Sequence, residues 1–432
     1  MGKSKSIDLT EMKEQAIVVG IGKKNSDREL AFEYLDELEL LADTAGAEVI
    51  EKIYQELAKP NASTVIGKGK VEEIKQTIYE NNVSLVIFDD DLTPAQARNL
   101  EQILKVKIID RSGLILDIFA RNARSLEAKT QVELAQLEYF LPRLSGLWTH
   151  LSKQYSGVGT KGPGETQIET DRRLVRLRIS HLKDKLKTIA LQKEEQRKSR
   201  QKVPKFGLVG YTNAGKSTLM NAITDAGVFV EDRLFATLDT TVRSFNLPGG
   251  QEAILSDTVG FIRKLPTNLV ASFRSTLAEA GYADVLMHVV DVSCPNFRSQ
   301  MEVVENTLKT LKIFEKPIVR VFNKTDCFDT NSDDYYLLKS IQNDFPDAVF
   351  ISAKERINLD KLLEVLSNAY NQNNRYFRFI LPYTDMDKLS KIYGIGDILS
   401  REEIDEGILL EVSISERERS LFLNNFAKFF KE

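Results

Sequence analysis

Cysteine and histidine are scarce in this chain of 432 residues, which has only two cysteines and three histidines. Cys294 and Cys327 cannot build a framework of several disulfides. A four-ligand zinc site would need both cysteines and two of the three histidines. The composition therefore argues against a disulfide-stabilised secreted domain and against a structural zinc site, and we expect a protein of the reducing cytoplasm.

Long apolar runs and a strong net charge are also absent. No apolar run reaches about 18 residues, the length of a membrane span, and the N-terminal MGKSKSIDLT lacks the apolar core of a secretory signal. The net charge of -4 excludes a chain uniformly coated for nucleic acid, but it leaves room for one basic surface. With 42% hydrophobic and 28% charged residues, the chain has the composition of a globular protein.

The first part of the chain alternates between apolar strand-like segments and amphipathic helical segments. We expect strands near 16–21, 47–54, 84–90 and 106–110, and helices near 28–45, 71–81 and from Thr93-Pro94 onward. This alternation is typical of a parallel sheet with crossover helices. The Gly-Lys-Gly-Lys run at 67–70 could cradle a phosphate of ATP, but so short a run is also a turn that begins a helix, which we favour.

Two helical segments follow, at 129–141 and 169–202. In the second, apolar residues recur at a 4-3-4-3 spacing, at Val175, Ile179, Leu182, Leu186 and Ile189. This spacing gives a helix one narrow apolar seam, as in coiled coils, so we expect an antiparallel hairpin. The intervening residues 141–167 contain five glycines and the only tryptophan, Trp148, and we expect a long mobile tip there.

A second α/β pattern begins with FGLVG after Pro204 and ends near residue 370. A short module then closes the chain, with strands expected near 375–382 and 407–414 and helices near 386–393 and 416–430. We therefore expect an N-terminal α/β domain (1–128), a basic helical hairpin (129–202), a second α/β domain (203–372) and a small α+β domain (373–432).

The segment GYTNAGKS, Gly210 to Ser217, is a complete G-x-x-x-x-G-K-S loop between an apolar strand and a helical run. The glycines let backbone N–H groups turn toward a phosphate, and the start of the helix adds positive potential. Lys216 would reach the β- and γ-phosphates, and Ser217 would ligate Mg²⁺. The pattern predicts a nucleoside triphosphate site.

The segment NKTD, Asn323 to Asp326, follows another apolar strand. A carboxylate at 326 can accept two hydrogen bonds from N1–H and the amino group of guanine, donors that adenine does not present together. By itself, an Asp after a strand could equally be a helix N-cap. The segment SAK, 352–354, follows at the spacing of a second base-contacting loop, so the combination predicts that Asp326 selects guanine.

Taken together, GYTNAGKS, FATLD, DTVG, NKTD and SAK resemble the translation-factor branch of P-loop GTPases. The string KGPGETQIETDRRLVR at 161–176 is similar to the signature that precedes the G domain in HflX-type ribosome-associated GTPases. This resemblance covers nearly the whole chain. It implies an α/β fold in which residues 203–372 form the GTPase domain, hydrolysis of GTP to GDP and phosphate, and ribosome contacts through the N-terminal and helical parts.

The resemblance also implies a switch I segment at 234–243, in which Thr237 contacts Mg²⁺ and the γ-phosphate, with Thr240 and Thr241 as alternatives. Asp257 would hold the same ion through water. A proline common in the family after FATLD is Thr240 here, which leaves this switch less rigid.

The expected site residues fall into three groups. The expected catalytic residues are Lys216, Thr237, Asp257 and Gly260, and the expected direct Mg²⁺ ligands are Ser217 and Thr237. The residues expected to bind GTP, as substrate, are Gly210, Tyr211, Thr212, Asn213, Ala214, Gly215, Lys216, Ser217, Thr218, Phe235, Ala236, Thr237, Leu238, Asp239, Asp257, Thr258, Val259, Gly260, Asn323, Lys324, Thr325, Asp326, Ser352, Ala353 and Lys354.

Phe261 follows the D-x-x-G element at 257–260, where many GTP-binding proteins have a glutamine that orients the attacking water. Phenylalanine cannot make that hydrogen bond. Hydrolysis in this superfamily depends largely on positioning and charge stabilisation, so we expect Phe261 to lower the rate without removing the chemistry. The resemblance implies an apolar residue here and stimulation by the ribosome, so turnover should be slow until large subunits are added.

Positive charge is concentrated in residues 171–205. This segment contains 13 Lys and Arg residues and 4 Asp and Glu residues, which gives a local charge of +9. Such a segment suits the neutralisation of RNA phosphates, and nearby aromatic residues suit stacking on unpaired bases, although charge runs are usually solvated helical faces. The further residues that we expect on this surface are Arg143, Trp148, His150, Lys153, Tyr155 and Lys161.

We therefore expect a monomeric GTPase that binds the large ribosomal subunit and its RNA, and that splits or rescues stalled ribosomes under stress. One alternative is a ribosome-assembly GTPase, which would bind subunit precursors. A second alternative is a GTP-gated RNA-binding protein with little hydrolysis.

Overall fold

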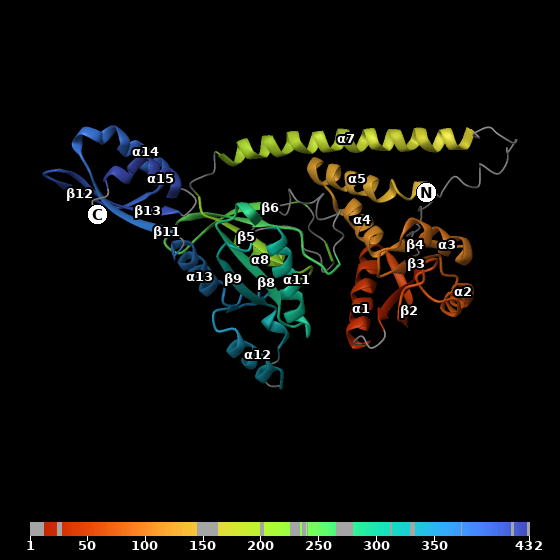
Figure 1. The fold of residues 1–432 in the computed structure, drawn as a ribbon. Coiled ribbons are helices and arrows are strands. Elements are labelled where there is room, and N and C mark those ends of the chain that lie inside the picture. The colour runs from red at the N-terminus through yellow and green to blue at the C-terminus, as the bar shows by residue number, and fades with distance from the viewer. Residues whose placement is uncertain are drawn as a thin grey trace, which may run out of the picture. The chain divides into compact units, whose positions relative to one another are not determined.

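The computed structural model describes residues 13–23, 28–144, 163–198, 203–224, 234–235, 239, 241–264, 280–311, 313–328, 333–372, 374–415 and 419–429 (Figure 1). The chain divides into two compact units. The first comprises residues 1–189 with the short segments 231–238 and 264–273, and the second comprises the remaining residues. Leu234, Phe235 and Lys264 are the described residues of those short segments.

The first unit is built on a four-stranded parallel sheet in the order β2-β1-β3-β4. Its strands are β1 (Glu14–Lys23), β2 (Ala47–Leu57), β3 (Leu85–Phe88) and β4 (Lys107–Asp110). Its crossover helices are α1 (Arg28–Thr44), α2 (Lys68–Asn81) and α3 (Pro94–Leu104), and α4 (Arg111–Asn122) follows β4 directly. The expected parallel sheet is confirmed, but the sequence patterns did not predict α4.

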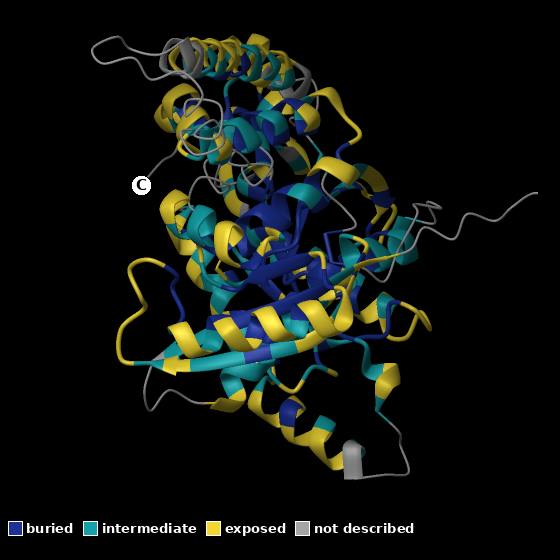
Figure 2. Ribbon diagram, turned by 90° about the vertical axis from the view of Figure 1, so that its right-hand side faces the viewer, coloured by how far each residue is buried: buried dark blue, intermediate teal, exposed yellow. Residues whose placement is uncertain are grey.

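Local signals explain where several helices begin. Thr93 and Gln96 form a reciprocal capping box at the start of α3, with Pro94 in the first turn. Asp110 caps α4 by accepting a hydrogen bond from Gly113 N. α2 begins at Lys68 after Gly67, so the Gly-Lys-Gly-Lys run does form a helix start. Figure 2 shows that buried residues are concentrated in central strands such as β3, whereas most helices also carry exposed positions.

Helices α5 (Leu126–Phe140) and α7 (Pro163–Lys198) pack through the expected apolar seam. Leu134 and Leu137 of α5 contact the cluster that includes Ile179 and Leu182 of α7. α7 begins at Pro163, so the expected tip, 141–167, is shorter than predicted, and residues 145–162 lie outside the described part. Although α7 has 36 residues, it is polar, and the described part of the chain has no helix long and apolar enough to span a membrane.

The second unit contains a six-stranded sheet in the order β10-β9-β8-β5-β7-β6, in which only β6 runs antiparallel to its neighbour. Its strands are β5 (Lys205–Gly210), β6 (Thr241–Asn246), β7 (Glu252–Asp257), β8 (Val285–Asp291), β9 (Ile318–Asn323) and β10 (Val349–Phe350). Its helices are α8 (Lys216–Thr224), α11 (Phe297–Thr310), η2 (Thr325–Cys327), α12 (Asp333–Asp344) and α13 (Leu359–Gln372). The strands bring the phosphate and base loops to one edge of this sheet.

The C-terminal part forms an antiparallel sheet in the order β11-β13-β12. Its elements are β11 (Asn374–Leu381), η3 (Tyr383–Lys388), α14 (Leu389–Ile395), β12 (Asp397–Ile404), β13 (Gly407–Ser415), α15 (Arg419–Phe426) and η4 (Ala427–Phe429). The strand β12 was not predicted, because its polar sequence DILSREEI lacks a clear apolar alternation. The helix expected at 386–393 is instead a 3₁₀ turn followed by α14.

Candidate nucleotide-binding site

The loop Gly210–Ser217 joins the end of β5 to the start of α8. Its two glycines, Gly210 and Gly215, lie where there is no room for a side chain. A Cβ atom at Gly210 would lie 2.3 Å from Val289 O, and one at Gly215 would lie 2.2 Å from Asn323 Nδ2. Gly215 and Asn213 also have positive φ angles of 87° and 59°. Close backbone packing and left-handed conformation therefore explain why the motif needs glycine at these positions.

Lys216, the loop lysine, is buried and donates hydrogen bonds from Nζ to the carbonyls of Gly210, at 3.2 Å, and Tyr211, at 2.8 Å. Burial lowers the pKa of Lys216 to about 8, and the nearby Asp257 carboxylate opposes this effect. The ammonium group is thus held beside the loop backbone, where a phosphate oxygen could replace the carbonyls as its partner.

Asp257, at the end of β7, is only 1% exposed, and its Oδ2 accepts a hydrogen bond of 2.6 Å from Ser217 Oγ. Burial raises the pKa of Asp257, whereas Lys216 and the hydrogen bonds from Ser217 and the Thr258 backbone lower it. Among the described residues, Asp257 Oδ1 has no hydrogen-bond partner. A buried, unpartnered carboxylate oxygen beside a serine hydroxyl fits the oxygen ligands that Mg²⁺ prefers.

The segment after Asp257 is bonded to the phosphate loop through the backbone. Phe261 N donates to Gly210 O at 3.0 Å, and Thr212 N donates to Phe261 O at 2.8 Å. A Cβ atom at Gly260 would lie 2.8 Å from Thr212 Cα and 3.1 Å from Lys216 Nζ, so glycine lets this segment approach the loop. Phe261 is 1% exposed, which shows that its ring belongs to the core.

Asn323 connects the phosphate loop with the expected base-contacting loops. Its Nδ2 donates to Ala214 O, and its Oδ1 accepts from Ala353 N, both at 3.0 Å. Ser352 Oγ donates to Asp326 Oδ1 at 2.6 Å, which orients that carboxylate. The structure therefore brings NKTD, SAK and the phosphate loop together, and the amide of Asn323 links them.

Only part of the expected switch I segment is described. Ala236, Thr237 and Leu238 lie outside the described residues, so the roles of Thr237 stay predictions. Phe235 has a positive φ of 57°, and its buried ring packs edge-on against Phe119 of α4. Its carbonyl accepts a hydrogen bond of 2.8 Å from Asn122 Nδ2. A residue with a strained backbone is thus held by two side chains of α4.

The sequence patterns did not predict a second contact that holds a residue near the nucleotide motifs. Lys264, four residues after Gly260, forms ion pairs with Asp89 and Asp90, which follow β3 in the same compact unit. Burial tends to lower the pKa of Lys264, but the two carboxylates raise it above its usual value. The run Asp89 to Asp91 after an apolar strand was the only sequence signal of this contact.

Arg143 differs from its expected role on the RNA-binding surface. It is 20% exposed, and its guanidinium pairs with Asp110 and donates hydrogen bonds to the carbonyls of Leu92 and Tyr139. Because these donors are used inside the unit, we no longer count Arg143 among the RNA-binding residues. The other tip residues proposed for RNA lie outside the described part.

Three family descriptions match consecutive parts of the chain. Residues 32–120 match the GTP-binding GTPase N-terminal region, and residues 122–200 match the GTP-binding GTPase middle region. Residues 205–324 match the 50S ribosome-binding GTPase family. The matches therefore cover most of the first unit, α7 and most of the nucleotide site.

Relatives named GTPase HflX are similar over most of the chain. The protein from Flavobacterium psychrophilum is 48% identical over 85% of this chain and 94% of its own length. The protein from Lacrimispora saccharolytica is 45% identical over 94% of this chain and 95% of its own length. A GTP-binding protein from the archaeon Sulfolobus solfataricus, solved with GDP, is 26% identical over 83% of this chain and 99% of its own chain, with a TM-score of 0.43. On the sequence identity and coverage of the curated relatives, the chain belongs to the HflX family of GTPases and hydrolyses GTP.

Proposed function

We propose that this GTPase acts on the ribosome, with the large subunit as the partner that accelerates its hydrolysis. The observation that carries the proposal is the combination of two features: the phosphate loop, Asp257 and the expected base-contacting loops come together, and the long helix α7 carries exposed basic residues. The match of residues 205–324 to a family described as 50S ribosome-binding supports the choice of partner.

In the nucleotide site, Lys216 would exchange the carbonyls of Gly210 and Tyr211 for oxygens of the β- and γ-phosphates. Gly260 N–H, beside Lys216, would sense the γ-phosphate, because no side chain separates the two residues. Asp326, oriented by Ser352, would accept the two guanine donors. These groups bind and orient GTP and stabilise charge, which is most of what phosphoryl transfer requires.

Mg²⁺ would be held by Ser217, by Asp257 through water, and by Thr237 if that threonine takes its expected role. When bound, the ion neutralises charge on the β- and γ-phosphates. The hydrogen bond between Ser217 Oγ and Asp257 Oδ2 supports this proposal, because it joins the proposed direct ligand to the carboxylate that would hold the ion through water.

The proposed RNA surface lies on α7, on the side away from its seam with α5. Arg173 and Arg176 are exposed, and the described residues offer them no ion pair. Arg178 differs, because its Nε lies 2.7 Å from Glu133 Oε1, and Lys183 pairs with Glu138 at 2.8 Å. These two cations hold α5 and α7 together, whereas Arg173 and Arg176 remain available for phosphates.

GTP turnover with and without large ribosomal subunits tests the chemistry and the partner together. We expect slow release of phosphate by the protein alone and a substantial increase when subunits are added. An unchanged rate with subunits would contradict the proposed stimulation. RNA binding without any phosphate release would favour the alternative of a GTP-gated RNA-binding protein.

Charge reversal tests the surface on α7. Arg173→Glu combined with Arg176→Glu should abolish co-sedimentation with large subunits at moderate salt and leave GTP affinity unchanged. Lys75→Glu combined with Lys361→Glu, which reverses two exposed charges outside α7, is the matched control. If the α7 variant still co-sediments like the control, α7 is not the RNA-binding surface.

The proposed outcome of this cycle is the splitting or rescue of stalled ribosomes. Sedimentation of intact ribosomes with protein and GTP should show fewer intact ribosomes and more free subunits. Binding restricted to subunit precursors, with intact ribosomes unaffected, would favour a ribosome-assembly GTPase.

A further inference from the structure

The loop that follows β3, residues 89–92, has contacts with the GTPase switch region at its first end. Lys264 Nζ lies 2.8 Å from Asp90 Oδ1 and also pairs with Asp89. The backbone of Lys264 is in the left-handed region, with φ of 51°. For a lysine this conformation is strained, so the ion pairs help to hold the segment that follows the D-x-x-G element.

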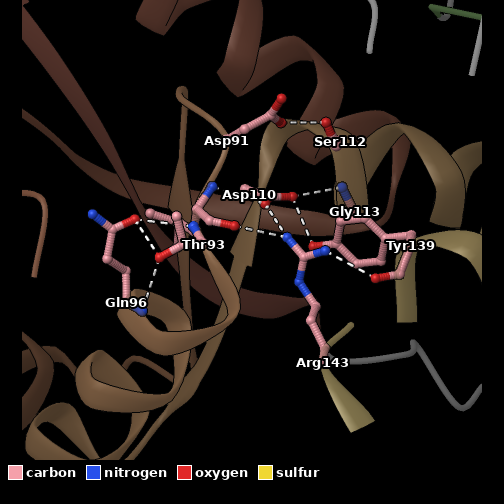
Figure 3. A network of polar contacts seen from close by, with 9 residues as sticks. Asp91, Thr93, Gln96, Asp110, Ser112, Gly113, Tyr139 and Arg143 are labelled. Atoms are coloured by element: carbon pink, nitrogen blue, oxygen red, sulfur yellow. Dashed lines mark hydrogen bonds and ion pairs between the residues drawn. The ribbon is translucent and has the colours of Figure 1, made fainter. Parts of the chain in front are cut away.

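The other end of the same loop contacts Arg143, which lies three residues after the end of α5, and Figure 3 shows Arg143 and Tyr139 both bonded to Asp110. Arg143 Nη2 donates to Leu92 O at 2.9 Å and lies 2.8 Å from Asp110 Oδ2, and Leu92 N donates to the same carboxylate at 3.1 Å. Tyr139, in the last turn of α5, donates its hydroxyl to Asp110 Oδ1 at 2.7 Å. Asp110 is therefore a buried acceptor shared by the loop and by α5.

The loop between these two ends is firmly held. Asp89, 3% exposed, pairs with Arg111 at 2.7 Å, and Arg111 also pairs with Glu37 of α1. Asp91 accepts a hydrogen bond from Ser112 in the first turn of α4. Side-chain networks with several hydrogen bonds and ion pairs limit local movement, so we expect a displacement at one end to reach the other.

We propose that residues 89–92, with Asp110, form a positioning network that couples the pair of helices α5 and α7, of which α7 carries the proposed RNA surface, to the GTPase switch segment at Lys264. Binding of RNA to α7 displaces α5, which shifts Tyr139 and Arg143 against Asp110 and Leu92, and so changes the position of Lys264. This inference rests on the proposed function, because it assumes that α7 is the RNA-binding surface and that large subunits stimulate hydrolysis.

Two substitutions interrupt the network at opposite ends. Tyr139→Phe removes one donor to Asp110 without changing the shape of the ring, and Lys264→Met removes the cation from a side chain that is 40% exposed. Each should lower the ratio of subunit-stimulated to intrinsic kcat by about fivefold or more, the range of ordinary allosteric coupling. KM for GTP and co-sedimentation with subunits should remain those of the wild type.

The double variant shows whether the two ends belong to one route. Because either substitution interrupts the same network, the double variant should lose no more stimulation than the more affected single variant. Lys264→Arg keeps the cation, so this variant should retain the stimulation of GTP hydrolysis by large subunits that Lys264→Met loses. Lys52→Met is the matched control, since Lys52 also pairs with two carboxylates, Asp36 and Glu39, but lies on β2.

Unchanged stimulation in the Lys264→Met and Tyr139→Phe variants would overturn the inference, as would strictly additive losses or loss of co-sedimentation. If Tyr139→Phe prevents folding, the comparison of Lys264→Met with Lys264→Arg decides alone. Failure of subunits to stimulate the wild type would remove the proposed function as well. If large subunits stimulate GTP hydrolysis equally in the wild type and in the variants, only this inference is wrong and the proposed function stands.

Discussion

Ser217 Oγ and Asp257 Oδ2 are joined by a hydrogen bond of 2.6 Å, which connects the first turn of α8 with the end of β7. The two residues are 40 positions apart and come from the two motifs expected to hold Mg²⁺. Their contact, with the second carboxylate oxygen of Asp257 unpartnered among the described residues, makes the pair the most direct support for a cation beside the phosphate loop.

Ser217→Ala should weaken the effect of Mg²⁺ on GTP binding, because it removes one proposed ligand and the donor that orients Asp257. We expect GTP affinity without Mg²⁺ to change little and the tightening on adding Mg²⁺ to fall by about tenfold or more. Calorimetric titration with and without the ion measures both, with Ser390→Ala, an exposed serine in α14, as the control. A Mg²⁺ effect as large as in the wild type would exclude Ser217 as a ligand.

GTP affinity should depend on pH through Lys216, whose pKa burial lowers to about 8. Below that pH the free protein already carries the ammonium group. Above it, phosphate binding must first protonate the amine, so affinity should fall by up to about tenfold per pH unit until the pKa in the complex is reached.

Calorimetry in two buffers with different protonation enthalpies measures this proton uptake. Uptake should rise from near zero at about pH 7 toward one proton at about pH 9. Lys216→Arg, which stays charged throughout, is the control. Absence of uptake in the wild type at the higher pH would show that the free lysine is charged there.

Asp326→Asn should change the base that the site accepts. The asparagine amide would place a donor where guanine also has donors, so GTP affinity should fall by about 10- to 100-fold. Xanthosine triphosphate has a carbonyl in place of the guanine amino group. It should bind more tightly to the variant than to the wild-type protein. Competition binding with both nucleotides tests this, and equal loss of both would mean that the substitution only disrupts the loop.

Much of the fold followed from local patterns. The apolar strands and capped helices of the first unit were predictable because each signal lies within one segment, as at Thr93 and Gln96. Elements whose sequence signal is weak could not be predicted, and α4 and β12 are the two clear cases. α7 begins at Pro163, earlier than the expected start at 169, because proline is favourable in the first turn of a helix even in a segment that contains glycine.

The candidate site shows the same division. The phosphate and base motifs are contiguous strings, so the sequence identified them directly. Pairings between distant segments gave no such signal: Lys264 and Asp89 are 175 positions apart, and Arg143 was assigned to a surface although Asp110 holds it inside. Charge and residue type indicate that an arginine will have a partner, but only the fold determines which one.

Phe261 can be tested by restoring the residue that many related motifs carry. Phe261→Gln should not accelerate hydrolysis, because the side chain at this position is buried, and the glutamine amide would enter the core. Lost apolar packing and an unpaired amide should instead cost about 2–4 kcal/mol of stability. Phe261→Leu, which remains apolar, should cost less and provides the matched control. Denaturant unfolding and single-turnover hydrolysis measure the two effects, and a clear rise in turnover for the glutamine variant would show that residue 261 can reach the attacking water.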